Sequence, residues 1–515
     1  MITSVRGLRA RLRADDTLSR KASLNMFAAL VDYAARVLVA LAVSPVLVSR
    51  LGDVAFGIYQ VLTRLINYAT PAGGRPSQAL KWTIARHQHS TAFDEKRLQV
   101  GCALAVWILF LPLLATAGGI LAWFAPVIVG APDSLYLTIR VTAGVLVADL
   151  ILTNLVTIPQ SVVQGENLGY KRLGLSTAVV VIGGGLAAAA VLLGWGLVGV
   201  AAAATTTTVL SGLVFLWVSR RNVPWFGVAR PPWRAVRVFL NLSGWFLLWN
   251  LIAQIMRGGD IVVLGIVGSA QLVTVYVLAR YVPEAIFGAV AIGISGIMPG
   301  LGGLLGAQET RRAADVRSES MTLTWLIATA SGATFLLWHA SFLSLWVGEE
   351  YVPERIAMLL IVALMLQLAF IRNDASIIDL TLELRAKVLL GLVSAAASVA
   401  LAVVLVRGLD LGLAGVAAGF LAGRVLLTVS YPWLVCGHLG LPFAAEVRAA
   451  ARPLAVCVAL YVTTTLASSA ADTGSWLVLV VAAALTFTAI ASLAFRIGLT
   501  GRQRRRLVSR ARGLV

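Results

Sequence analysis

Fourteen separate apolar stretches, each long enough to cross a bilayer, run along this chain with only short polar segments between them. Hydrophobic residues make up 59% of the sequence, charged residues make up 13%, and the mean hydropathy is +0.88. Such stretches must be helices, because lipid offers no hydrogen-bond partner to backbone N–H and C=O groups. We therefore predict an all-α polytopic membrane protein with about 14 transmembrane helices.

The predicted spans are roughly 24–48, 54–79, 98–122, 136–162, 172–194, 196–218, 239–257, 262–297, 321–345, 356–378, 388–406, 411–435, 453–470 and 475–496. The eighth stretch is too long for one crossing. It is predicted to contain a surface segment around Gly265–Gln271, followed by a helix from about Val273.

Lys and Arg are unevenly distributed over the polar segments. When these segments are grouped alternately from the N-terminus, one set holds about 31 basic residues, and the other holds only Arg50, Arg355 and Arg407. Because basic residues stay on the cytoplasmic side, both termini are predicted to be cytoplasmic. The net charge of +19 then follows mostly from topology, and the basic tail is expected to lie on anionic membrane lipid rather than on nucleic acid.

The two halves of the chain resemble each other. Three pairs of segments are related at offsets of 216 to 218 residues: Gly52–Arg64 with Gly268–Arg280, Gly130–Asp133 with Gly348–Tyr351, and Gly196–Ala203 with Gly412–Gly419. An offset that spans six helices returns the second copy to the same side of the membrane, as in transporters built from parallel repeats. We predict two six-helix lobes followed by two additional helices.

The predicted divisions are a basic cytoplasmic tail (1–23), an N-lobe (24–218), a cytoplasmic linker (219–238), a C-lobe (239–435), a cytoplasmic loop (436–452), the two additional helices (453–496) and a second basic tail (497–515).

Ionisable residues within the predicted spans are costly, at roughly 2.5–3.5 kcal/mol each on insertion scales, so each is a candidate for function. The cationic candidates for substrate binding are Arg64, Arg280, Arg424, Arg75, Arg36, Arg257 and Arg372. The acidic candidates for ion coupling are Asp32, Asp149, Asp260, Glu284 and Asp374.

Three acid–base pairs have a spacing that places both members on one helical face. They are Asp32 with Arg36, Arg280 with Glu284, and Arg257 with Asp260. Each pair either neutralises itself and holds helices together or takes part in transport, and the spacing leaves both interpretations open. Arg64, Arg75 and Arg424 have no acid at helical spacing. They are the stronger candidates for an anion, because a planar guanidinium suits phosphate oxygens.

The segment Thr70–Ser77 breaks the second predicted span near its cytoplasmic end. Free backbone groups are tolerated there only where they face protein or water, so the segment is either a gate or a simple kink. The sequence has no Gly-x-x-x-x-Gly-Lys-Ser/Thr phosphate loop, and its three cysteines and four histidines form no metal-binding pattern. We expect no cofactor, no metal and no catalytic residue.

Several segments resemble bacterial polysaccharide flippases. Asn25, Pro45–Gly52 and Phe56–Tyr59 resemble the opening of these proteins, and Asp260–Gly265 followed by Tyr276 resembles the start of their second lobe. They are the Wzx-type members of the multidrug/oligosaccharidyl-lipid/polysaccharide exporter superfamily, and the resemblance extends over essentially the whole chain.

The resemblance implies a function in surface polysaccharide synthesis, for O-antigen, exopolysaccharide or capsule. It implies that the protein carries an undecaprenyl-pyrophosphate-linked oligosaccharide from the cytoplasmic to the outer leaflet of the bacterial inner membrane. Two lobes would alternate access around a cationic cavity. A polysaccharide polymerase and a chain-length regulator are the further partners to be sought.

Other functions remain open at this stage. A drug/cation antiporter of the same superfamily needs a carboxylate within the membrane, for which Asp32 or Asp149 could serve, but such exporters typically have twelve helices. A lipid II flippase differs only in its substrate. A glycan polymerase or glycosyltransferase could use Asp53, yet such enzymes generally carry a sizeable outward loop, and the segment with Asp53 has about six residues. We therefore predict a flippase rather than an enzyme.

Overall fold

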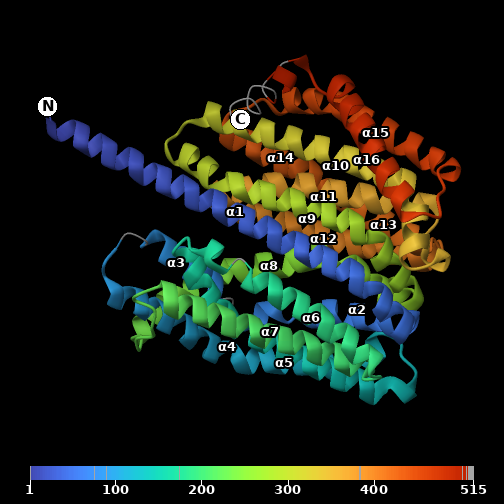
Figure 1. Ribbon diagram of the computed structural model, residues 1–515, viewed down its shortest axis with the longest axis horizontal. Helices are drawn as coiled ribbons and strands as arrows, with labels where there is room; N and C mark the ends of the chain where they lie inside the picture. The colour runs from blue at the N-terminus through green and yellow to red at the C-terminus, as the bar shows by residue number, and fades with distance from the viewer. Residues whose placement is uncertain are drawn as a thin grey trace. The chain divides into compact units, whose positions relative to one another are not determined.

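The computed structural model describes residues 2–74, 76–87, 90–172, 174–381, 384–501, 503–505 and 507, and it describes their side chains except at 2–23, 26, 82, 86, 241–250, 299 and 384. Every regular element in these ranges is a helix (Figure 1). The helices form two compact units, Met1–Gln254 (unit 1) and Ile255–Val515 (unit 2). The predicted all-α fold class is confirmed.

Unit 1 is organised around α5. Its elements are α1 (Ile2–Leu51), α2 (Asp53–Asn67), η1 (Thr70–Gly73), α3 (Pro76–Arg86), α4 (Phe93–Ile128), η2 (Asp133–Leu135), α5 (Tyr136–Gly165), η3 (Gly169–Arg172), α6 (Leu175–Leu192), α7 (Gly196–Asn222) and most of α8 (Trp233–Val267). Helix α5 packs against α2, α3, α4 and α7, and α6 packs between α1 and α7.

Unit 2 is organised around α10 and α11. Its further elements are α9 (Ala270–Gly306), α10 (Thr310–Trp346), η4 (Glu349–Tyr351), α11 (Arg355–Thr381), α12 (Leu384–Val403), a π-helical turn η5 (Val404–Gly408), α13 (Gly412–Gly423), α14 (Val425–Leu439), α15 (Phe443–Ala467), η6 (Ser468–Ala470) and α16 (Trp476–Ile497). Helix α10 contacts α9, α11, α15 and α16, while α11 also contacts α9, α13 and α14.

Twelve helices in the described part of the chain are long and apolar enough to cross a membrane. The two other predicted spans correspond to α2–α3, which η1 interrupts, and to α8. Large apolar side chains such as Leu109, Trp123, Leu477 and Leu485 are exposed on the helices. Extensive exposed apolar surface of this kind is expected where helices face lipid.

Two interruptions that the sequence predicts are present. Gly268 and Ser269 separate α8 from α9, and the Ser269 hydroxyl caps the first turn of α9. The turn Thr70–Gly73 separates α2 from α3, and Gly74 ends it with a φ of 68°. A Cβ at Gly74 would also lie 2.8 Å from the Phe110 ring, so glycine is required there by both its backbone angle and its contact.

Corresponding helices of the two units begin at a nearly constant offset. Helix α4 begins at Phe93 and α10 at Thr310, 217 residues later, while α7 begins at Gly196 and α13 at Gly412, 216 residues later. The same neighbours pack together: α4 on α5 and α6 on α7 in unit 1, α10 on α11 and α12 on α13 in unit 2. This agrees with the predicted repeat.

Candidate functional site

A buried ion cluster lies between the C-terminal part of α8 and the N-terminal part of α9. Asp260 accepts a hydrogen bond from the Tyr276 hydroxyl (2.9 Å) and forms an ion pair with Arg280. The break at Gly268–Ser269 brings the end of α8 and the start of α9 together. The three side chains belong to residues seven to eleven positions from that break, about 10–17 Å along a helix. The ion pair therefore lies about two turns or more inside helices α8 and α9.

Arg424 joins this cluster from the junction of α13 and α14. Its Nη2 donates to the carbonyl oxygen of Met256, and its guanidinium carbon lies 5.3 Å from the centre of the Phe420 ring. The side chain is 1% exposed, and its Nη1 has no hydrogen-bond acceptor within the described residues. A buried donor left without an acceptor costs about 1–3 kcal/mol, so an added acceptor would be most favourable here. We call Asp260, Tyr276, Arg280 and Arg424 the arginine cluster.

The buried part of the arginine cluster carries a net positive charge. Arg280 and Arg424 are both at most 2% exposed, and they share the single buried carboxylate of Asp260. The second acid, Glu284, lies 3.3 Å from Arg280, but its side chain is 42% exposed. Within the buried part of the cluster, two guanidiniums therefore share one carboxylate.

One of the two local pairs predicted in this region is replaced by a pair between helices. Arg280 and Glu284 do pair across one helical turn. Asp260, however, pairs with Arg280 of the next helix, and the side chain of Arg257 is exposed. The Arg257 carbonyl oxygen accepts a hydrogen bond from Arg280 Nη2 (2.5 Å), so the Arg257 backbone supports the cluster.

The partner of Asp32 in unit 1 also differs from the prediction. Its carboxylate pairs with Arg172 of η3 at 3.0 Å and accepts a hydrogen bond from the Ser176 hydroxyl (2.7 Å), while Arg36 is exposed. Burial lowers the pKa of the Arg172 guanidinium, and Asp32 opposes this shift. The expected Asp32–Arg36 pair is wrong, because a cation from the α5–α6 connection reaches the carboxylate.

Sequence reasoning missed two further networks in unit 2. Arg317 of α10 binds both oxygens of Asp374 on α11 (2.8 and 3.1 Å) and Glu446 on α15 (2.8 Å). Lys387 of α12 is fully buried and pairs with Asp379 at 2.5 Å. The charge pattern places Arg317 and Lys387 among the cytoplasmic cations. Their positions near the ends of long helices are a signal that they pack against other helices. Their neighbours in sequence do not show which acids they pair with.

The remaining candidates lie elsewhere. Arg64 on α2 and Asp149 on α5 are half-buried in unit 1, and Arg372 on α11 is half-buried in unit 2. One carboxylate oxygen of Asp149 is buried without a hydrogen-bond partner in the described part of the chain. Arg75 lies outside the described residues. Within unit 2, the structure thus brings together Asp260, Arg280, Glu284 and Arg424, and it places Asp374 in a separate network.

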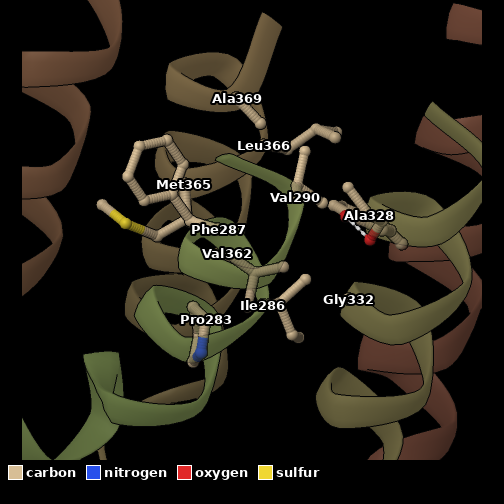
Figure 2. A pocket seen from close by; sticks show the side chains of 11 residues that line it. Pro283, Ile286, Phe287, Val290, Ala328, Gly332, Val362, Met365, Leu366 and Ala369 are labelled. Atoms are coloured by element: carbon tan, nitrogen blue, oxygen red, sulfur yellow. Dashed lines mark hydrogen bonds between the residues drawn. The ribbon is translucent and has the colours of Figure 1, made fainter. Parts of the chain in front are cut away.

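A small apolar pocket lies in unit 2 between α9, α10, α11 and α15 (Figure 2). Pro283 and Phe287 of α9 and Val362 of α11 are among its lining residues, none of which is charged. Its volume is about 20 Å³, which is room for roughly one water molecule. The pocket is therefore too small for a sugar or a pyrophosphate, and its lining offers no charged group to an anion.

No family model matches the chain, and no curated protein matches it. Solved structures do match. An inward-facing multidrug resistance MATE family transporter of the MOP superfamily is 17% identical, with a TM-score of 0.62 over 81% of this chain and 98% of that chain. The lipid II flippase MurJ, in an inward closed conformation, is 12% identical, with a TM-score of 0.64 over 92% of this chain and 99% of that chain.

The chain has the fold of the MATE transporters and of MurJ. An outward-facing MATE transporter matches as well, at 16% identity and a TM-score of 0.58 over 82% of this chain. The expected multi-pass helical fold is therefore confirmed, whereas membership of the exporter superfamily and the Wzx-type assignment stay predictions. The match to MurJ includes about a tenth more of the chain than either MATE match.

Proposed function

We propose that this protein moves an undecaprenyl-pyrophosphate-linked oligosaccharide from the cytoplasmic to the outer leaflet of a bacterial inner membrane, for the synthesis of a surface polysaccharide. The observation that carries the proposal is the excess positive charge of the arginine cluster at mid-span. Such charge is costly in a membrane. A pyrophosphate would supply the acceptors that Arg424 Nη1 lacks, in the fork-like geometry that arginine favours.

The fold supports a transporter, and the extent of the match supports a flippase. The MATE matches cover 81–82% of this chain, whereas the match to a protein described as a lipid II flippase covers 92%. The sequence predicts two helices beyond the two six-helix lobes, and α15 and α16 occupy that place. A drug antiporter is the less favoured alternative, and lipid II is the nearest alternative cargo.

The proposed mechanism begins from a closed arginine cluster. Arg280 and Arg424 are sealed from solvent, so a pyrophosphate reaches them only when α8, α9 and the α13–α14 junction separate. The phosphate oxygens would then take over acceptor positions that Asp260 and the Met256 carbonyl now occupy. Alternating access requires contacts that can break and form again. Hydrogen bonds from arginine to phosphate are charge-assisted, like the contact with Asp260 that they would replace.

The candidates for ion coupling have different surroundings. Asp32, Asp260 and Asp374 are each paired with an arginine. Asp149 is half-buried, and one of its carboxylate oxygens has no hydrogen-bond partner among the described residues. We propose Asp149 as the coupling carboxylate and Arg64 as a second cargo cation, both in unit 1.

Reconstitution tests the proposed function. Purified protein is placed in liposomes that contain an undecaprenyl-pyrophosphate-linked oligosaccharide, and translocation is measured as access of an added glycosidase to the sugar. Parallel vesicles contain lipid II or ethidium. We expect protein-dependent translocation of the oligosaccharide lipid. Efflux of ethidium alone would favour the antiporter, and movement of lipid II alone would change the cargo.

Orientation is tested separately with reporter fusions. Fusions after Val515 and within Arg311–Arg317 should report the cytoplasm, and a fusion at Glu349–Glu350 should report the outside, as the asymmetry of basic residues predicts. A cytoplasmic signal at Glu350 would contradict the predicted topology.

A further inference from the structure

A second pocket lies in unit 1, at chain segments that the charge distribution places on the cytoplasmic side. Its volume is about 270 Å³, close to the lower end of the range for small-molecule sites. It is formed by the two residues 90–91 ahead of α4, the start of α4, the end of α5 and the segment that follows α7. The lining residues that matter here are Thr91, Phe93, Lys96, Glu166, Asn222 and Trp225.

The polar groups of this pocket are fixed in place. Lys96 is 3% exposed and pairs with Glu166 at 2.9 Å, and the Trp225 indole N–H donates to the same carboxylate oxygen at 2.9 Å. The Lys96 ammonium lies 5.3 Å from the centre of the Trp225 ring. Arg97 Nε in turn donates to the Trp225 carbonyl oxygen at 3.0 Å. A ligand would therefore meet groups that are already ordered, which lowers the cost of binding.

The charge of this pocket differs from that of the arginine cluster. Among the described lining residues, Lys96 and Glu166 are the charged ones, and they pair with each other, so this lining has no excess charge to select a phosphate. The remaining polar lining consists of the Ser90 and Thr91 hydroxyls and the Asn222 amide, all of which can donate and accept hydrogen bonds. The Asn222 amide nitrogen already donates to the Val218 carbonyl oxygen. The lining therefore suits a neutral ligand with several hydroxyl groups.

The rim of the pocket adds an aromatic surface. Phe93 is 43% exposed and lines the pocket together with Pro224 and Leu168. A pyranose ring presents apolar C–H groups on its faces and hydroxyl groups around its edge. Apolar and aromatic walls combined with a few fixed polar groups match both features. The volume admits a single ring rather than a long glycan.

We propose that this pocket binds one sugar residue of the lipid-linked oligosaccharide on the cytoplasmic side, before translocation. The inference rests on the proposed function and extends it. The arginine cluster in unit 2 recognises the pyrophosphate, which all such cargoes share, and the pocket in unit 1 distinguishes one glycan from another.

Direct binding is the first test. Full-length protein in detergent micelles is examined by saturation-transfer NMR, with free glucose, galactose, N-acetylglucosamine and rhamnose as probes. The variants are Phe93→Ala and Asn222→Ala. Phe124→Ala is the matched control, since Phe124 lies on the same helix and is similarly exposed but does not line the pocket. We expect at least one sugar to bind wild type and the control, with a roughly tenfold loss of affinity in each pocket variant, the scale of one lost contact.

Translocation separates this inference from the proposed function. With the oligosaccharide lipid as cargo, both pocket variants should raise KM by roughly tenfold with little change in kcat, because a contact made before the rate-limiting step is lost. With undecaprenyl pyrophosphate, which has no sugar, they should match wild type. If wild type moves neither lipid, the proposed function fails. If wild type moves the oligosaccharide lipid while no probe binds, or while both variants keep its KM, the sugar site alone is overturned.

Discussion

Two sets of ionisable residues on the helices, one set in each unit, differ in how deeply they are buried. In unit 2, Asp260, Arg280 and Arg424 close on one another and are at most 2% exposed. In unit 1, Arg64 and Asp149 are only half-buried. Arg64 and Arg280 stand 216 residues apart, at corresponding positions of the predicted repeat. Equivalent arginines therefore meet different environments in the two halves of one chain.

This difference separates two roles that a membrane-embedded arginine can have. An arginine sealed in an ion network holds helices together and becomes available to a cargo only when the network opens. A half-buried arginine contributes less to stability and is closer to solvent from the start. Substitutions in the arginine cluster should therefore affect folding and transport together, whereas substitution of Arg64 should affect transport with little effect on folding.

The largest effect is expected for Asp260→Asn. The substitution leaves Arg280 and Arg424 without their buried carboxylate, and breaking a buried ion pair in this way costs roughly 3–5 kcal/mol. Thermal unfolding in detergent and the amount of protein in the membrane measure the loss. Glu284→Gln is the matched control, expected to cost at most about 1 kcal/mol because Glu284 is 42% exposed. Equal stability of Asp260→Asn and wild type would show that the cluster does not hold unit 2 together.

Arg64→Ala and Arg280→Ala test the comparison itself. Arg64→Ala should reduce translocation of the oligosaccharide lipid by roughly a hundredfold, the scale of a lost charge-assisted contact to phosphate, with an unchanged Tm. Arg280→Ala should lower both translocation and Tm. Lysine at position 64 should restore translocation only in part, because it loses the planar fork. Normal translocation by Arg64→Ala would remove Arg64 from the cargo path.

A smaller effect is expected at the ion pair between α1 and η3. Asp32→Asn and Arg172→Ala should each reduce the free energy of unfolding by about 1–2 kcal/mol, because each leaves one partner without its ion pair. Arg36→Ala should remain within about 0.5 kcal/mol, as is usual for exposed positions. Chemical unfolding of the two single variants and the double variant gives the coupling energy. Equal losses for Arg36→Ala and Asp32→Asn would instead favour the local pair.

The fold could largely be predicted from the sequence because its signals are local. Hydropathy marks each spanning helix within its own residues. Gly268 and Ser269, and the Thr70–Gly73 turn, show where helices break. The sequence likewise identified Arg280, Arg424 and Asp260 as candidates, because any charge within an apolar span is conspicuous.

The partners of these charges could not be predicted, because helical spacing identifies only neighbours on the same helix. Asp32 pairs with a residue 140 positions away, and Arg317 pairs with Asp374, 57 positions away. The rule succeeded for Arg280 and Glu284, which share a helix. Lys96 on α4 and Glu166 at the end of α5 both line the proposed sugar pocket and pair with each other. The sequence around either residue does not indicate its partner.

The central claim is that arginines within the membrane serve the pyrophosphate of the cargo. Its most direct test compares translocation of two lipids with the same undecaprenyl chain and the same sugar, one with the pyrophosphate and one with a neutral ether linkage. Wild type should move the pyrophosphate lipid at least roughly tenfold faster than the ether lipid, which is the effect of about one charge-assisted contact. The variants Arg64→Ala and Arg424→Ala should lose that preference. Equal rates for the two lipids in wild type, or an unchanged preference in both variants, would contradict the account.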